Sequence, residues 1–135
     1  MKIRSFQLED YEEVVSLWTQ AGLRLSPSDS REAITHKLER DADLFLVAVE
    51  GTAIVGAVMG TYDGRRGWIN HLAVASQQQH QKLGTRLMRE VEHRLLQKGC
   101  AKIQLFILPT NATVQTFYQR LGYQRDEMIL MEKWL

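Results

Sequence analysis

The sequence has little cysteine and no long apolar run. Its one cysteine, Cys100, has no second thiol with which to form an internal disulfide, so covalent cross-links are excluded from the expected fold. No run of about eighteen apolar residues is present, and the first residues, "MKIRSFQLEDYEE", lack the apolar segment of a signal peptide. We therefore expect a cytoplasmic protein that does not act on a membrane.

The sequence also lacks an excess of positive or negative charge. The 17 basic and 16 acidic side chains leave a formal net charge of +1, which gives no basis for general electrostatic binding of nucleic acid. The four histidines lie far apart, with none of the spacings of metal ligands, so no metal is expected. With 44% hydrophobic and 24% charged residues, the chain is expected to form one globular domain over residues 1–135.

Hydrophobic periodicity predicts an alternation of strands and helices. Strands are expected at residues 2–6, 44–50, 53–62, 68–75, 101–108 and 124–135, and helices at 9–22, 29–39, 83–99 and 111–122. Asp29 is the expected N-cap of the second helix, and the strand 101–108 is apolar enough to be central and buried on both faces. The order β-α-α-β-β-β-α-β-α-β predicts an α/β fold, a mixed sheet with helices on its faces.

Two helices carry clear apolar stripes. The third expected helix repeats apolar residues at Leu83, Leu87, Val91 and Leu95, with Gly99 where a left-handed residue ends a helix. The fourth is expected to turn Val114, Phe117, Tyr118 and Leu121 inward before it ends at Gly122.

The segment "VASQQQHQKLGTRLM" leads from a strand through a polar loop into the start of the third helix. A helix N-terminus leaves four backbone N–H groups unpaired and carries about half a positive charge, so such a segment can bind an anion. Its glycine spacing fits neither a Walker loop nor a dinucleotide-binding fingerprint. Taken alone, the loop is more typical of a solvated turn than of a binding site.

Two motifs resemble those of the GCN5-related N-acetyltransferase (GNAT) family. Residues 79–84, "QHQKLG", resemble its Q/R-x-x-G-x-G/A motif, and residues 111–123, "NATVQTFYQRLGY", resemble its N-x-x-A/V-x-x-F/L-Y-x-x-x-G-F/Y segment. The resemblance implies a GNAT-type domain that moves an acetyl group from acetyl-CoA directly to an amine, without an acyl-enzyme. It also implies cofactor binding by Leu72, Ala73, Val74, Gln79, His80, Gln81, Lys82, Leu83, Gly84, Thr85 and Asn111; for Asn111, a helix-capping role is an equal alternative.

Lys82 departs from the family pattern, which has glycine at this position. If the glycine serves a positive φ, a lysine there costs about 1 kcal/mol in strain, which its ammonium can recover by pairing with a phosphate.

The implied reaction has two proton transfers. The departing thiolate, with a pKa of about 8.5, leaves more easily when it is protonated, and Tyr118 matches the family position whose phenol does this. The second transfer takes a proton from the amine, yet neither strand 68–75 nor strand 101–108 contains a carboxylate. Alternation puts Trp68, Asn70 and Leu72 on one face and Ile69, His71 and Ala73 on the other. The resemblance turns Asn70 toward the site, so His71 is expected in the opposite layer.

Without a strong base, the acceptor is expected to be an amine of lowered pKa. At pH 7 a lysine amine (pKa about 10.4) is neutral about once in 2,500 molecules, whereas an α-amine (pKa about 7.8) is neutral about once in seven. The acceptor is therefore a small-molecule amine or the N-terminus of a peptide or protein, unless a water chain carries the proton or His71 is the base after all.

Two rival functions remain open at this point. One is a non-catalytic acyl-CoA sensor or interaction domain, and the other is a nucleotide-binding module that uses the same helix end. The apolar final stretch "MILMEKWL" could also support a homodimer.

Overall fold

The computed structural model describes residues 1–111 and 113–135, without the side chains of residues 79–81. The chain divides into two compact units, Met1–Leu105 and Phe106–Leu135, each of which has its own structure.

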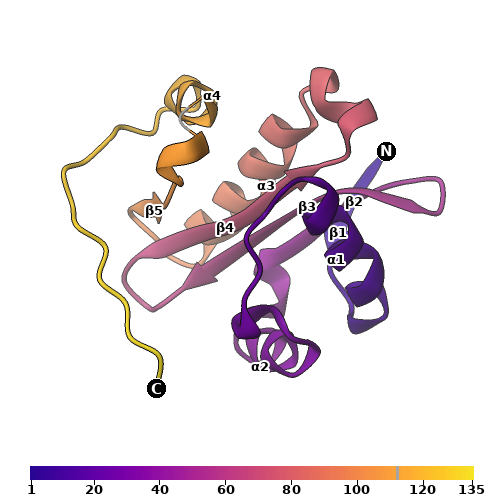
Figure 1. The fold of residues 1–135 in the computed structure, drawn as a ribbon, viewed down its shortest axis with the longest axis horizontal. Helices are drawn as coiled ribbons and strands as arrows, with labels where there is room; N and C mark the ends of the chain where they lie inside the picture. The colour runs from indigo at the N-terminus through magenta and orange to yellow at the C-terminus, as the bar shows by residue number, and fades with distance from the viewer. Residues whose placement is uncertain (112) are drawn as a thin grey trace. The chain divides into compact units, whose positions relative to one another are not determined.

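The first unit is built on a five-stranded sheet with the order β1-β2-β3-β4-β5 (Figure 1). Its strands are β1 (Lys2–Ser5), β2 (Phe45–Glu50), β3 (Ala53–Tyr62), β4 (Gly67–Val74) and β5 (Ile103–Leu105). The first four strands pair antiparallel, and β5 pairs parallel with β4. Short hairpin turns connect β2 to β3 and β3 to β4, and in the second turn the Asp63 carboxylate accepts the backbone N–H groups of Arg65 and Arg66. The predicted strands 2–6, 44–50, 53–62 and 68–75 are thus confirmed to within a residue or two.

Helices cover both faces of this sheet. The helices α1 (Tyr11–Gln20) and α2 (Arg31–Asp41) lie on one side and α3 (Leu83–Gln97) lies on the other (Figure 1). On the first side, Trp18 and Ile34 are buried with Phe45 of β2. On the second side, the predicted α3 stripe is confirmed, because all four of its residues are buried. None of the described helices is long and apolar enough to cross a membrane.

Glycines in β3 bring α3 close to the sheet. A Cβ at Gly60 would lie 2.6 Å from Val91 Cγ2, and one at Gly56 would lie 2.9 Å from Leu87 Cδ1. The absence of side chains at these two positions therefore makes room for the apolar stripe of α3.

The start of α2 differs from the sequence prediction. Ser30, not Asp29, is its N-cap, because the Ser30 hydroxyl accepts the Ala33 N–H at 3.1 Å. Asp29 instead closes a 3-10 turn over Pro27–Asp29, where its Oδ2 accepts the Ser26 N–H at 3.0 Å. The sequence offers Asp29 and Ser30 as neighbouring caps, and Ser30 is the one that caps α2. Asp29 uses one carboxylate oxygen in the 3-10 turn, so its second oxygen is available for another partner.

The strand predicted at 101–108 is also wrong in extent and place. β5 covers only Ile103–Leu105, its residues are half-buried, and it lies at the edge of the sheet. A strand is central only when strands pair with both of its edges, and its faces are buried only where other elements cover them. In the described part of the chain, β5 has β4 alone as its partner.

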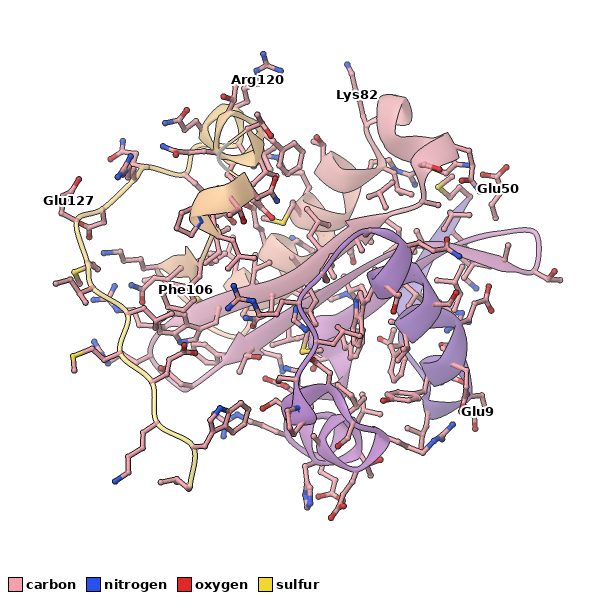
Figure 2. All side chains as sticks on the ribbon, viewed as in Figure 1. Glu9, Glu50, Lys82, Phe106, Arg120 and Glu127 are labelled. Carbon is pink, nitrogen blue, oxygen red and sulfur yellow. The ribbon has the colours of Figure 1, made fainter. Side chains whose placement is uncertain are left out.

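The second unit contains a 3-10 turn (Pro109–Asn111) and α4 (Val114–Arg120). The four residues expected to face inward, Val114, Phe117, Tyr118 and Leu121, are each partly buried, and Gly122 has φ = 99° after the helix. The strand predicted at 124–135 is wrong. This segment has no regular structure and its side chains are exposed. The label of Glu127 locates the segment in Figure 2. Its backbone pairs with no strand in the described chain, and an unpaired strand has no ladder to stabilise it.

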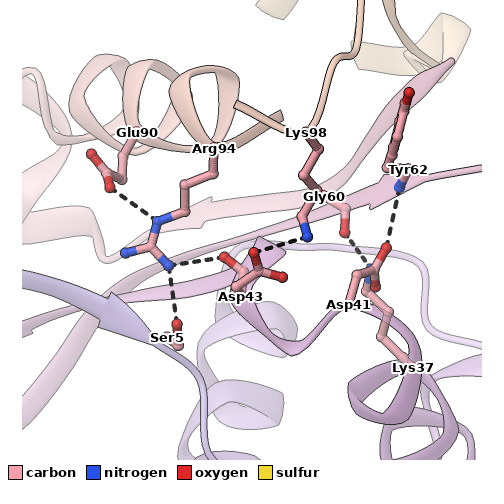
Figure 3. A network of polar contacts seen from close by, with 9 residues as sticks. All are labelled: Ser5, Lys37, Asp41, Asp43, Gly60, Tyr62, Glu90, Arg94 and Lys98. Carbon is pink, nitrogen blue, oxygen red and sulfur yellow. Dashed lines mark hydrogen bonds and ion pairs between the residues drawn. The ribbon is translucent and has the colours of Figure 1, made fainter. Parts of the chain in front are cut away.

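Polar contacts attach α2 and α3 to the sheet (Figure 3). Arg94 of α3 donates to Ser5 Oγ at 3.0 Å and to the Asp43 carbonyl at 2.9 Å. On the other side, Lys37 of α2 donates to Asp41 and to the Gly60 carbonyl. Burial lowers the pKa of the Lys37 ammonium, although Asp41 acts in the opposite direction.

Replacing Gly60 by alanine is expected to lower the free energy of unfolding by about 1–3 kcal/mol, because the new Cβ would overlap Val91 Cγ2. Val91→Ala removes that methyl group. The double variant should therefore lose at least about 1 kcal/mol less than the sum of the two single changes. Urea unfolding of the four proteins in this cycle measures the coupling, and strictly additive losses would contradict the close packing.

Candidate functional site

At the N-terminus of α3, the side chain of the N-cap residue Lys82 forms no cap to the backbone N–H groups. The first bond of the helix runs from the Arg86 N–H to the Lys82 carbonyl at 3.1 Å, so the N–H groups of Leu83, Gly84 and Thr85 precede the helical ladder. Lys82, the N-cap residue, makes no side-chain cap, and its exposed side chain extends away from the ribbon (Figure 2). This end of α3 can therefore receive an anion on its backbone.

Lys82 adopts a left-handed conformation, with φ = 59° and ψ = 23°, between a 3-10 turn (Ser76–Gln81) and α3. This is the position at which the resembling motif has glycine, and the positive φ explains why glycine suits it. Lysine carries the expected strain of about 1 kcal/mol. The predicted contributions of the Gln79, His80 and Gln81 side chains lie outside the described part of the structure.

β4 contains a bulge at His71. Asn70 pairs with Met59 and Ala73 pairs with Ala57, so two residues of β4, His71 and Leu72, oppose the single residue Val58. His71 has φ = 54°, a left-handed conformation that is uncommon for a non-glycine residue.

The bulge changes which side chains share a face. Residues paired directly across a sheet point to the same side, so Asn70 lies on the face of Met59, which belongs to the core under α1 and α2. His71 contacts Trp18 of α1, with 4.9 Å between the ring centroids, and is therefore on this face too. The expectation that His71 lies in the layer opposite Asn70 is wrong, because the extra residue interrupts the alternation.

His71 forms a polar pair with Asp29. The distance from His71 Nε2 to Asp29 Oδ1 is 2.8 Å, and the two side chains are 22% and 10% exposed. The backbone around Asp29 is held separately, since the Tyr11 hydroxyl donates to the Asp29 carbonyl at 2.7 Å. The two residues are 42 positions apart, and the sequence contains no spacing signal that could have found this pair.

β4 extends beyond the end of β5. The last pair between these strands is Ile69 with Leu105, whereas β4 continues to Val74. Within residues 1–105, no strand pairs with this final part of β4 on the β5 side. Leu72 and Val74 are half-buried and Ala73 is buried, so the side chains of these three residues are packed. The backbone of this segment lies beyond the residues of β4 that pair with β5.

Two predicted site residues lie in the second unit. Tyr118 packs edge-on against Phe117 and Tyr123, with ring centroids 5.0 and 5.8 Å away. Burial raises the pKa of the Tyr118 phenol to about 12, so the hydroxyl keeps its proton at neutral pH. Asn111 is exposed at the end of its 3-10 turn, and the N-cap residue of α4 is Thr113, so Asn111 is not that cap.

Comparisons with known proteins agree with this architecture. A family model described as "Acetyltransferase (GNAT) family" matches residues 6–123. Ard1 from Thermoplasma volcanium superposes with a TM-score of 0.82 at 20% identity, covering 93% of this chain and 84% of that one. The PaiA N-acetyltransferase from Thermoplasma acidophilum, solved in complex with coenzyme A, gives 0.80 at 21% identity over 95% and 92%. Glucosamine-6-phosphate N-acetyltransferase from Arabidopsis thaliana gives 0.69 at 23% identity over 98% and 97%. At these identities the structural matches show the fold.

Lys82→Gly is expected to leave the Kd for acetyl-CoA within about tenfold, or about 1.4 kcal/mol, because the backbone N–H groups rather than the ammonium are expected to hold the anion. Lys82→Ala is the matched control, since it removes the ammonium but keeps the strained Cβ. Isothermal titration calorimetry measures both variants. A loss of about a hundredfold in both would instead make the ammonium an essential phosphate ligand.

Proposed function

The chain belongs to the GNAT family of acetyltransferases, and we propose that it transfers the acetyl group of acetyl-CoA directly to an amine of a small molecule or of a peptide or protein N-terminus. One observation carries the proposal: β4 leads through a single 3-10 turn into the N-terminus of α3, where the N-cap residue Lys82 makes no side-chain cap, in a chain whose family uses acetyl-CoA.

The residues present suit the diphosphate of coenzyme A. In the proposed complex, the N–H groups of Leu83, Gly84 and Thr85 hold the phosphates, together with the turn from Gln79 to Lys82. The edge of β4 at Leu72–Val74 is proposed to bind the pantetheine arm. The amide of Asn111 is proposed as a further hydrogen-bonding group for that arm. A strand edge offers alternating N–H and C=O groups, which match the two amides of that arm.

Three side chains are proposed to act in the reaction. Tyr118 is proposed to donate its proton to the departing thiolate. Burial raises the pKa of the phenol to about 12, so the proton is present throughout the neutral range, although the same shift makes the phenol a weaker acid. His71 takes the proton from the amine, and the exposed Asn70 beside it orients the acceptor. The bulge supports these two roles, because it turns both residues to one face of the sheet.

Binding can be tested by thermal shift with acetyl-CoA, CoA, ATP and NAD. A ligand at a hundred times its Kd adds about 2.7 kcal/mol, which for a domain of this size is a rise of several degrees. We expect a rise with the CoA species alone. Thr85→Asp should abolish it, because a carboxylate at a helix N-terminus repels phosphate while it favours the helix. Thr85→Asn is the neutral control and should retain the rise.

Turnover separates an enzyme from a sensor domain. CoA release is expected to be faster with α-amines than with lysine side-chain amines at pH 7, because more of the α-amine is neutral. Binding of acetyl-CoA without turnover of any amine would identify a non-catalytic acyl-CoA sensor. A rise in stability with ATP or NAD in place of CoA would identify a nucleotide-binding module.

Tyr118→Phe is expected to lower kcat about a hundredfold, because the thiolate then leaves without a proton donor, while the Kd for acetyl-CoA changes less than threefold. Tyr123→Phe is the matched control, as it removes a phenol hydroxyl from the same unit at a position where the family motif accepts phenylalanine. A stopped-flow or thiol-release assay measures both. Equal rates for Tyr118→Phe and the parent would remove Tyr118 from the chemistry.

A further inference from the structure

The two carboxylate oxygens of Asp29 have separate partners. Oδ2 accepts the Ser26 N–H at 3.0 Å and completes the 3-10 turn, whereas Oδ1 lies 2.8 Å from His71 Nε2. The turn needs only the first contact. The second contact joins the segment before α2 to the bulge in β4, and it fixes one nitrogen of the His71 ring.

This contact selects the tautomer of His71. An ionised carboxylate can only accept hydrogen bonds, so Nε2 must carry a proton and donate the hydrogen bond to Asp29. In the neutral ring, Nδ1 then keeps its lone pair. None of the described residues hydrogen-bonds Nδ1, and the side chain remains 22% exposed.

We propose that Asp29 is a positioning residue for acetyl transfer, which holds the His71 ring by Nε2–H so that Nδ1 accepts the proton of the acceptor amine. The inference rests on the proposed function and adds to it a residue from the segment before α2. Asp29 does not touch the reacting atoms, and it acts through His71 alone.

The protons balance in this scheme. Nδ1 takes one proton from the acceptor ammonium, and the freed nitrogen lone pair forms the C–N bond to the acetyl carbon. The C–S bond breaks, and its electron pair leaves with sulfur, which takes the Tyr118 proton. The second amine proton that is lost on amide formation restores the phenol through solvent. Asp29 stabilises the imidazolium of His71 while the ring holds the first proton.

Few other charged groups surround the pair in the described structure. Tyr11 donates its hydroxyl to the Asp29 carbonyl, Arg31 lies 5.1 Å above the Tyr11 ring, and Glu12 pairs with Arg31. Trp18, which is uncharged, contacts the His71 ring in a T-shaped arrangement, with 4.9 Å between the ring centroids. Asp29 is therefore the carboxylate in contact with the ring, and its removal should be visible in the pH profile.

The decisive variant is Asp29→Asn. Its amide oxygen can still accept the Ser26 N–H, while its NH₂ group faces His71 Nε2 and forces the proton onto Nδ1. Removal of the aspartate in a catalytic His–Asp pair by this change lowers kcat by up to about 10⁴. Here we expect a fall of about a hundredfold or more, with the Kd for acetyl-CoA within threefold.

Asp10→Asn is the matched control. Asp10 also ends a 3-10 turn and accepts the N–H of the residue three positions before it, Gln7, at 2.9 Å, but its other partner is Arg4. This variant should keep kcat within twofold. If loss of any turn carboxylate had a general effect, kcat would fall equally in both variants, and this result would overturn the proposal.

A cycle with His71→Ala tests whether Asp29 acts through the ring. In the parent, kcat/KM should fall on the acid side with an ionisation that is absent from His71→Ala. Adding Asp29→Asn to His71→Ala should change the rate less than threefold. The same hundredfold loss in that background, or an Asp29→Asn variant with kcat within threefold of the parent, would contradict the proposal.

The tautomer itself is measurable without a variant. Nitrogen-15 NMR of the parent protein, at a pH where the ring is neutral, should show His71 protonated at Nε2, and a proton on Nδ1 overturns the proposal even if Asp29→Asn fails to fold. The result also separates two kinds of failure. No turnover with any amine refutes the proposed function, whereas turnover with an Nδ1–H tautomer refutes only the role of Asp29.

Discussion

The contact between Asp29 and His71 across the β4 bulge is the interaction on which the candidate site depends. A non-glycine residue at positive φ costs about 1–2 kcal/mol, and a hydrogen bond to a charged group contributes about 1.5–3 kcal/mol. The contact therefore offsets the strain that places it. With regular alternation His71 would face α3, and the largely buried Asp29 oxygen would lack its partner, at a cost of about 1–3 kcal/mol.

Backbone strain of the same kind occurs at Lys82, just before α3 begins. Among the described residues, His71 and Lys82 are the non-glycine residues with positive φ, and they enclose the end of β4 and the turn into α3. Conformations of this kind persist where the surrounding structure holds them, and they gather at functional sites. The positive φ of His71 turns its side chain toward α1. The positive φ of Lys82 leads the chain into the start of α3, which the Lys82 side chain does not cap.

The proposed chemistry divides its two proton transfers between two environments. Burial keeps Tyr118 protonated, so the phenol carries the proton that the proposed donor to the departing thiolate needs. His71 instead has a carboxylate partner and an exposed fraction of its ring, which suit a group that must accept a proton and hold a charge briefly. A single carboxylate base is not required when the histidine is oriented in this way, so the absence of acidic residues from β4 and β5 does not argue against turnover.

The order of the helices, the four antiparallel strands, the α3 stripe and the two family motifs could all be predicted from the amino-acid sequence. These features depend on residues a few positions apart, whose periodicity can be read locally. Five features became visible only in the folded chain: the bulge at His71, its pairing with Asp29, the cap at Ser30, the short edge strand β5 and the irregular segment 124–135. Each of these depends on which backbone lies alongside and in what register, and hydrogen bonds between distant segments set that register.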